Sequence, residues 1–136
     1  PNFQLEAHQI QSSLNKSKLK HLLIYIHALC VEYDVDYNLV KAVIATESSW
    51  NHKATSTSDA RGLMQVKPQT AFAEFDPYVN VTLGIMYLSR LTQHYKMKTR
   101  ADLLTAYSHG PTATKGYSDR YRTQNFYVAS VLGKIN

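Results

Sequence analysis

The sequence predicts a mainly α-helical domain, and three observations support this prediction. Apolar residues recur at steps of three and four along nearly the whole chain, which is typical of helices with one buried face. No segment alternates convincingly between apolar and polar residues, so we expect at most a small hairpin, in the loop after Trp50. The 5 glycines and 4 prolines are few and fall mostly between the periodic segments.

The first expected helix covers about residues 17–33. Its apolar positions form one helical stripe: Leu19, Leu22, Leu23, Ile26, Leu29, Cys30 and Tyr33. Cys30 is the single cysteine, so the chain cannot form an internal disulfide. Because Cys30 falls on this stripe, we expect a buried thiol that acts as a small apolar side chain.

Asp36 is a suitable N-cap for a second helix. The inner face of this helix is expected to carry Leu39, Val40, Val43 and Ile44. A polar stretch rich in Ser and Thr follows from Asn51 to Arg61, and it predicts a loop. Pro68 suits the first turn of a short helix over Pro68–Glu74.

The remaining helices are expected in the second half of the chain. Asn80 can cap a long helix with an inner face made of Val81, Gly84, Ile85, Leu88, Leu91 and Tyr95. Thr99 and Asp102 have the spacing of a capping box, which predicts a helix that runs through Tyr107.

Gly110-Pro111 ends that helix, and a last helix is expected from about Tyr121. Its apolar face is predicted to comprise Tyr127, Val128, Val131, Leu132 and Ile135.

Length and charge restrict the classes of function. A chain of 136 residues fits one domain, residues 1–136, with a core of its own. The net charge of +5 suits a polyanionic partner, but the Lys and Arg residues are scattered, which disfavours a nucleic-acid-binding protein. No apolar run approaches the roughly 20 residues that span a bilayer. No signal peptide is in view in the chain as given.

Glu47 interrupts the apolar pattern of the second helix. It follows Ile44 by three residues and Val43 by four, so it takes a position where the stripe calls for an apolar side chain. A buried carboxyl group tends to stay protonated, and a glycosidase needs such an acid to protonate the leaving oxygen. The alternative is that Glu47 ends the helix and turns into water, and periodicity alone leaves both interpretations open.

Several polar and aromatic residues near Glu47 have the chemistry of a sugar site. Trp50 is the only tryptophan, and its indole ring is either a platform for a sugar or part of the core. Ser56 and Ser58 supply hydroxyls, and Gln65 supplies an amide. Taken singly, each of these side chains fits an ordinary structural role better than a functional one.

Read together, these residues resemble the goose-lysozyme-like lytic transglycosylases, the group typified by the catalytic domain of the soluble lytic transglycosylase. Three blocks between about residues 33 and 132 carry the resemblance: Glu47-Ser48-Ser49-Trp50 continuing to Gly62-Leu63-Met64-Gln65 and Pro68-Gln69-Thr70-Ala71; Asn80-Val81 with Gly84 and Tyr87-Leu88; and Ala106-Tyr107-Ser108-His109-Gly110-Pro111 with Tyr127-Val128. The resemblance implies a lysozyme-like helical domain of the goose type, with at most a small hairpin or loop region after the catalytic helix.

Carried over by position, the family's catalytic acid is Glu47. The resemblance assigns contacts with the substrate to Ser56, Ser58, Met64, Gln65, Tyr107 and Tyr127. The chain departs from the family pattern at His52, at Asp59, and at Ser108-His109, where Asn-Ala is usual.

The implied activity is the non-hydrolytic cleavage of the bond between N-acetylmuramic acid and N-acetylglucosamine in peptidoglycan, which leaves 1,6-anhydro ends. Glu47 would serve first as acid and then as base, and the implied reaction needs neither a metal nor a cofactor. The implied location is the periplasm or cell envelope, with a monomeric enzyme acting on glycan strands. A role in wall turnover, in a secretion or conjugation apparatus, or in a phage is compatible with such an enzyme.

Two other functions fit much of the same pattern. A lysozyme-type hydrolase on the same fold would use a second carboxylate, for which Asp59 and Asp76 are the candidates. A non-catalytic glycan-binding module would keep the cleft without turnover, although an acid retained in an apolar position argues against it.

Overall fold

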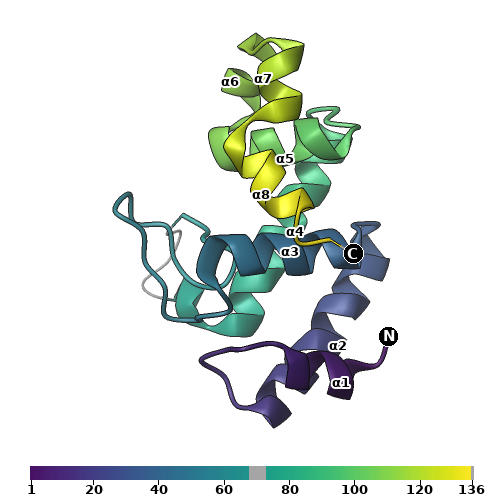
Figure 1. The fold of residues 1–136 in the computed structure, drawn as a ribbon, viewed down its shortest axis with the longest axis vertical. Helices are drawn as coiled ribbons and strands as arrows, with labels where there is room; N and C mark the ends of the chain where they lie inside the picture. The colour runs from purple at the N-terminus through teal and green to yellow at the C-terminus, as the bar shows by residue number, and fades with distance from the viewer. Residues whose placement is uncertain (68–72, 136) are drawn as a thin grey trace.

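The computed structural model describes residues 1–67 and 73–135. Within these ranges the chain forms α-helices, one short 3₁₀ helix and no β-strand, which confirms the prediction of a mainly helical fold (Figure 1). The helices are α1 (Phe3–Gln9), α2 (Lys16–Tyr33), α3 (Tyr37–Ser48), η1 (Ala73–Phe75), α4 (Pro77–Gln93), α5 (Arg100–His109), α6 (Pro111–Gly116), α7 (Asp119–Gln124) and α8 (Phe126–Leu132). No helix in the described part of the chain is long and apolar enough to cross a bilayer.

Helix α3 lies in the middle of the molecule, between two groups of helices (Figure 1). Helices α1 and α2 lie on one side of α3, and α5 to α8 lie on the other. Helix α4 links the two groups, because it packs against both α2 and α5, while α8 packs directly on α3. The largest fully buried side chains come from α2, α3, α4 and α5 and from the loop after α3, so a single apolar core runs through both groups.

The predicted second helix is confirmed, and its first turn shows why it begins where it does. The Asp36 carboxylate accepts a hydrogen bond from the backbone N–H of Leu39 at 3.0 Å, as an N-cap does. The helix ends at Ser48, because Ser49 and Trp50 both take left-handed backbone conformations, with φ of 51° and 61°. This ending turns the chain sharply into the loop that follows.

The first predicted helix and the buried thiol are also confirmed. Helix α2 begins at Lys16, and the side chains of its predicted stripe are buried as expected, apart from Tyr33, which is partly buried. Burial raises the pKa of the Cys30 thiol to about 12, so Cys30 stays protonated inside the core.

The segment after α3 is a loop with two isolated antiparallel bridges, Thr55 with Arg61 and Arg61 with Val66. This agrees with the expectation of at most a small hairpin there. Of the predicted short helix over Pro68–Glu74, residues 68–72 lie outside the described residues, and the 3₁₀ helix η1 covers only Ala73–Phe75.

The prediction that Asn80 caps the long helix is wrong. Asp76 is the N-cap of α4, and Asn80 is fully buried one turn inside the helix. Its amide oxygen accepts from the N–H of Met64 at 2.7 Å, and its amide nitrogen donates to the carbonyls of Arg61 at 2.8 Å and Glu74 at 2.6 Å. Asn80 therefore fastens the loop after α3 to helix α4.

Gly62 allows the close approach between that loop and α4. Its φ of 75° is left-handed, and a Cβ atom there would lie 2.4 Å from Nδ2 of Asn80. Gly84 has a similar role on α4, because a Cβ there would lie 2.4 Å from the sulfur of Met64. The two glycines let the loop and the helix pack closely.

The end of the chain differs from the prediction of one last helix. Helices α7 and α8 are separated at Asn125, whose side chain caps α8 by accepting from the N–H of Val128 at 3.0 Å. Helices α1 and α6 were not predicted, and α5 extends to His109 rather than stopping at Tyr107. Thr99 caps α5 as predicted, since its hydroxyl accepts from the N–H of Asp102.

Candidate active site

Glu47 projects from the last turn of α3, on the same face as Val43 and Ile44. Val43 and Ile44 are fully buried, whereas Glu47 is half-buried and lines a cleft. The interpretation in which Glu47 turns away into water is therefore wrong. The carboxyl group lies where the apolar stripe of the helix meets the cleft.

Burial and one hydrogen bond set the pKa of this carboxyl group. Burial raises the pKa of Glu47, because it removes water that would otherwise solvate the charged form. The phenol of Tyr127 donates a hydrogen bond to Oε2 of Glu47 at 2.7 Å, which lowers the pKa and offsets part of that effect. Burial and the nearby Glu47 raise the pKa of Tyr127 itself, so the phenol keeps the proton that it donates.

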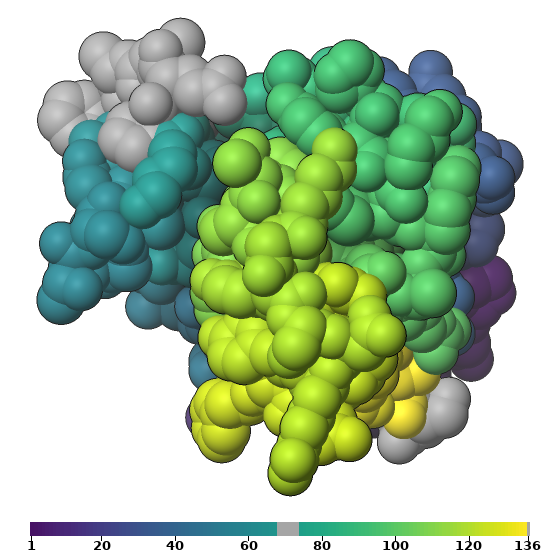
Figure 2. Space-filling view, turned by 90° about the horizontal axis from the view of Figure 1, so that it is seen from above, coloured from purple at the N-terminus to yellow at the C-terminus, as the bar shows by residue number. Residues whose placement is uncertain are grey.

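The cleft has a volume of about 620 Å³ and lies between the loop after α3, helix α4 and the end of α5. Figure 2 views the molecule from the α6–α7 end, with the teal loop on the left and the lime-green segment of α6 and α7 in front. The lining residues are Glu47, Ser56, Ser58, Ala60, Gln65, Val66, Lys67, Leu83, Tyr87, Tyr107, Ser108, His109 and Gly110. The structure thus brings Glu47 together with four of the six residues predicted to contact substrate.

Ser56 and Ser58 reach the cleft from one tight turn of the loop. The Ser56 hydroxyl accepts from the N–H of Ala60 at 3.0 Å and lies 3.2 Å from the Ser58 hydroxyl. The backbone N–H of Ser56 donates to the carbonyl of Ala60, which closes the turn. The two hydroxyls are therefore held side by side at the mouth of the cleft.

Gln65 lines the cleft in a left-handed backbone conformation, with φ of 53°. Its amide nitrogen donates to the carbonyls of Ala54 at 3.0 Å and Gly62 at 3.1 Å, so the side chain also braces the loop. Tyr107 crosses from α5, and its phenol donates to the carbonyl of Met64 at 2.6 Å. These bonds fix the wall of the cleft opposite α5.

The expectation that Met64 lines the floor beneath a sugar needs a correction. Its side chain is fully buried against Gly84 on α4 and is not among the lining residues. The apolar positions around it draw the side chain into the core, and only its backbone takes part, as the acceptor for Tyr107. Tyr127 does not line the cleft either and acts on it through Glu47.

The other carboxylates predicted as candidates do not line this cleft. Asp59 has a left-handed φ of 64°, its side chain is 58% exposed, and it pairs with Arg61 at 3.3 Å, which fits a turn. Asp76 is occupied as the N-cap of α4, where it accepts from the N–H groups of Tyr78 and Val79. Glu74, which was not a predicted candidate, is fully buried, and its carboxylate lies 4.0 Å from the guanidinium of Arg61.

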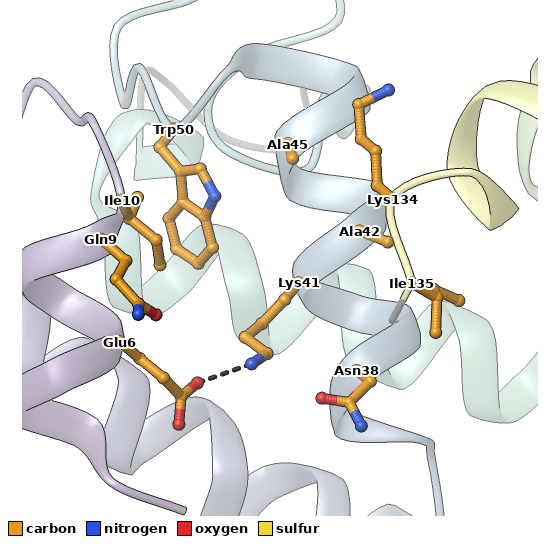
Figure 3. A pocket seen from close by; sticks show the side chains of 10 residues that line it. All are labelled: Glu6, Gln9, Ile10, Asn38, Lys41, Ala42, Ala45, Trp50, Lys134 and Ile135. Atoms are coloured by element: carbon orange, nitrogen blue, oxygen red, sulfur yellow. Dashed lines mark hydrogen bonds and ion pairs between the residues drawn. The ribbon is translucent and has the colours of Figure 1, made fainter.

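Trp50 belongs to a different part of the molecule. It is only 5% exposed, and Figure 3 shows its indole ring between α1 and α3, beside Ile10. It lines a smaller pocket of about 230 Å³, where Lys41 and Glu6 form an ion pair at 2.6 Å. Trp50 is thus a core residue, and the alternative of a sugar platform beside Glu47 is wrong.

Several cleft residues were not predicted as site residues. Lys67, Leu83, Tyr87 and His109 line the cleft, and the Tyr87 ring lies 5.7 Å from that of Tyr107. Leu83 and Tyr87 are four residues apart on α4, so the helical period places them on one face.

In the described part of the chain, no group of three or more His, Cys, Asp and Glu side chains could hold a metal ion.

Comparison with known proteins identifies the family. The profile described as the Transglycosylase SLT domain matches residues 24–129, which is most of the chain. The chain belongs to this family. Helices α3, α4 and α5, the loop after α3 and the Glu47–Tyr127 pair all lie within the matched SLT domain, whereas α1 lies outside it.

Two curated relatives carry lytic transglycosylase names. The chain is 29% identical over 140 residues to the membrane-bound lytic murein transglycosylase E of Buchnera aphidicola, covering 88% of this chain and 63% of the relative. It is 32% identical over 123 residues to the membrane-bound lytic murein transglycosylase C of Photorhabdus laumondii, covering 74% of this chain and 34% of the relative. The chain thus spans less than two thirds of the length of each.

A solved structure supports the fold. The chain resembles an inactive mutant of the lytic transglycosylase Slt from Pseudomonas aeruginosa, with a TM-score of 0.69 and 20% identity, over 82% of this chain and 23% of that one. This confirms the predicted lysozyme-like helical fold for the SLT domain.

Proposed function

We propose that this SLT domain cleaves peptidoglycan glycan strands as a lytic transglycosylase, with Glu47 as the catalytic acid and base. The observation that supports this proposal most is the environment of Glu47. Among the described residues that line the cleft, Glu47 supplies the only carboxyl group, and burial raises its pKa. The names of both curated relatives point to the same activity.

The proposed reaction uses this one carboxyl group twice. Protonated Glu47 gives its proton to the oxygen that bridges N-acetylmuramic acid and N-acetylglucosamine, and the glycosidic bond breaks. The acetamido oxygen of the muramic acid stabilises the positive charge that develops at the anomeric carbon.

The ionised Glu47 then takes the proton from the 6-hydroxyl of the same muramic acid. That oxygen attacks the anomeric carbon and closes a 1,6-anhydro ring, so the acid is regenerated without the addition of water. The attacking group belongs to the same sugar, which gives it a high effective concentration.

The neighbouring side chains orient this reaction in the proposal. The Tyr127 phenol holds Oε2 of Glu47, while Glu47 itself lines the cleft. The hydroxyls of Ser56 and Ser58, adjacent to each other in the loop, supply hydrogen bonds for the acetamido group and the carboxyl group. Gln65 from the loop and Tyr107 from α5 line the cleft in which the sugar rings lie.

A hydrolytic mechanism has less support in the geometry. Hydrolysing glycosidases usually place two carboxyl groups across the bond, one of them activating or replacing water. Asp59 and Asp76 do not line the cleft, and both carboxylates have other partners, Arg61 in one case and backbone N–H groups in the other. A single carboxyl group favours attack by the internal 6-hydroxyl.

The proposed substrate places the enzyme in the bacterial cell envelope, where peptidoglycan lies. Both curated relatives are named as membrane-bound. The proposal includes a monomer that acts on glycan strands without a nucleic-acid partner. The same reaction would serve wall turnover, a secretion or conjugation apparatus, or a phage.

Replacement of Glu47 by Gln tests the assignment of the acid. Glu47→Gln keeps the size of the side chain and can still accept from Tyr127, but it holds no transferable proton. We expect the rate of glycan cleavage to fall by at least about a thousandfold, which is about 4 kcal/mol of barrier. Glu32→Gln, an equivalent change at an exposed position on α2, is the matched control and should leave the rate unchanged.

The rate is measured from the soluble fragments released by purified peptidoglycan. If Glu47→Gln kept more than about a tenth of the wild-type rate, a loss of only about 1.4 kcal/mol, Glu47 would not be the acid.

A further inference from the structure

An aromatic cluster lies at the end of the cleft and takes no part in the steps proposed above. It consists of His109 at the end of α5, Tyr117 after α6 and Tyr121 in α7. The ring of His109 lies 5.6 Å from that of Tyr117 and 5.7 Å from that of Tyr121, both nearly perpendicular. The two tyrosine rings lie 4.5 Å apart.

The cluster is held in place by hydrogen bonds on each of its elements. The Tyr121 hydroxyl pairs with Nε2 of His109 at 3.0 Å. The hydroxyl of Ser118 caps α7 by accepting from the backbone N–H of Tyr121 at 3.1 Å. The guanidinium of Arg122 donates to the carbonyl of Tyr117 at 2.8 Å and to the carboxylate of Asp102 on α5 at 2.9 Å.

This bracing matters because a rigid surface loses little conformational entropy when it binds a ligand. The rings of the aromatic cluster are already oriented before any contact is made. A flexible arrangement of the same side chains would bind more weakly.

The aromatic cluster is continuous with the cleft and open to solvent. His109 lines the cleft together with Ser108 and Gly110. Tyr121 is 41% exposed, and a Cβ placed on Gly110 would have no neighbour within 4 Å. A chain that leaves the cleft at the end of α5 would therefore pass over these rings.

We propose that the aromatic cluster is an outlying sugar subsite, which binds a pyranose ring of the same glycan strand beyond the two sugars that flank the cut bond. The inference rests on the proposed function. Pyranose rings present C–H groups on their faces and hydroxyls at their edges, which suits aromatic rings that carry polar groups. The phenols of Tyr117 and Tyr121 and the imidazole of His109 combine both features.

A glycan strand is a polymer, so it continues past the bond that is cut. Contacts with a remote sugar then supply binding energy for long strands that short oligomers cannot use. The aromatic cluster thus makes the enzyme prefer longer strands. His109 is one of the positions at which this chain departs from the family pattern.

The test measures binding without turnover, in the Glu47→Gln background. Peptide-free glycan oligomers of increasing length are titrated into the protein by calorimetry. Addition of Tyr121→Ala is expected to weaken binding of the long oligomers about three- to tenfold, the range typical of one aromatic contact. Binding of the shortest oligomers that fill the cleft should stay unchanged.

Tyr78→Ala is the matched control. Tyr78 is also 41% exposed and also packs against a tyrosine, at 5.0 Å from Tyr25, but Tyr25 does not line the cleft, whereas Tyr121 packs against His109, which does. It should not change binding at any length. A second variant, Tyr121→Phe, keeps the ring and should retain most of the preference for long oligomers even if Tyr121→Ala disturbs α7.

Equal weakening at all lengths, or no weakening, would overturn the subsite. The same holds if Tyr78→Ala produced the same effect. These results leave the proposed function intact, because the products of the wild-type enzyme test it separately.

Discussion

The Tyr127 hydroxyl and the Glu47 carboxyl group form the contact on which the proposed reaction depends most. Burial raises the pKa of Glu47, and the hydrogen bond at 2.7 Å lowers it, so the working pKa is a balance of the two. The proposed first step needs protonated Glu47. The value of kcat/KM should therefore fall as the pH rises through the pKa of Glu47, which burial raises above its ordinary value.

Removal of the hydrogen bond should move this pH dependence in a known direction. In Tyr127→Phe the bond that stabilises the charged form is lost, so the pKa of Glu47 rises and the falling limb shifts to higher pH. The value of kcat should fall as well, because the carboxyl group is less well oriented. The measurement is the pH profile of kcat/KM on soluble glycan strands.

Tyr87→Phe is the control for that profile. It removes a phenol from the same cleft, and only Tyr127 among the described phenols is hydrogen-bonded to Glu47. The falling limb of the pH profile of kcat/KM should keep its position in Tyr87→Phe. A limb that stays in place or moves to lower pH in Tyr127→Phe would show that Tyr127 does not tune Glu47.

At the residue scale, the sequence predicts a site residue when that residue stands out from the periodicity of its own helix. Glu47 stands out because it breaks an apolar stripe, and the structure places it at the cleft. Its partner Tyr127 is 80 residues away, and no periodicity pairs the two, so a local pattern cannot predict that contact. Met64 shows the opposite error, since a motif position says nothing about whether a side chain points into the core or into a cleft.

At the scale of elements, Asn125 decides where α8 begins and hence where Tyr127 lies. Asn125 is 7% exposed. Its amide oxygen caps α8, and its amide nitrogen donates to the Thr105 hydroxyl at 2.8 Å and to the carbonyl of Tyr121 at 2.8 Å. The network links α5, α7 and α8 at one buried point.

Asn125→Ala should therefore cost more stability than an ordinary cap. The loss of the cap and of buried hydrogen bonds should lower the free energy of unfolding by about 2–3 kcal/mol. Asn15→Ala is the matched control, because Asn15 is an exposed N-cap with one bond to the N–H of Lys18, and about 1 kcal/mol is expected there.

Both free energies are measured by urea denaturation. Equal losses in the two variants would mean that the buried network contributes nothing beyond the cap.

Helix starts were predictable where the cap and the apolar stripe agree. Asp36 and Thr99 precede periodic segments directly, and both are caps in the structure. Asn80 has the composition of a cap, but Asp76 before Pro77 is an equally good start, and the helix begins there. The break at Asn125 was missed because the last helix was predicted to begin at about Tyr121, although every residue of its apolar stripe follows Asn125. A buried partner on α5 holds Asn125 as a cap.

At the scale of the whole molecule, the cleft exists because the loop after α3 is fixed on α4. The bonds from Asn80 to three backbone groups, and the space left by Gly62, make this contact. The mainly helical fold could be predicted from periodicity, since the long helices α2, α3 and α4 each show an apolar stripe. The placement of the loop could not, because it depends on hydrogen bonds between residues far apart in the sequence.

Analysis of the products by mass spectrometry tests the central claim most directly. Wild-type protein and Asp59→Asn are each incubated with purified peptidoglycan, and the new muramic acid ends are identified. Asp59 is an exposed turn residue paired with Arg61, so both proteins should release chiefly 1,6-anhydro ends at similar rates. Chiefly hydrated, reducing ends from the wild-type protein would contradict the account and indicate a hydrolase that uses a second carboxylate.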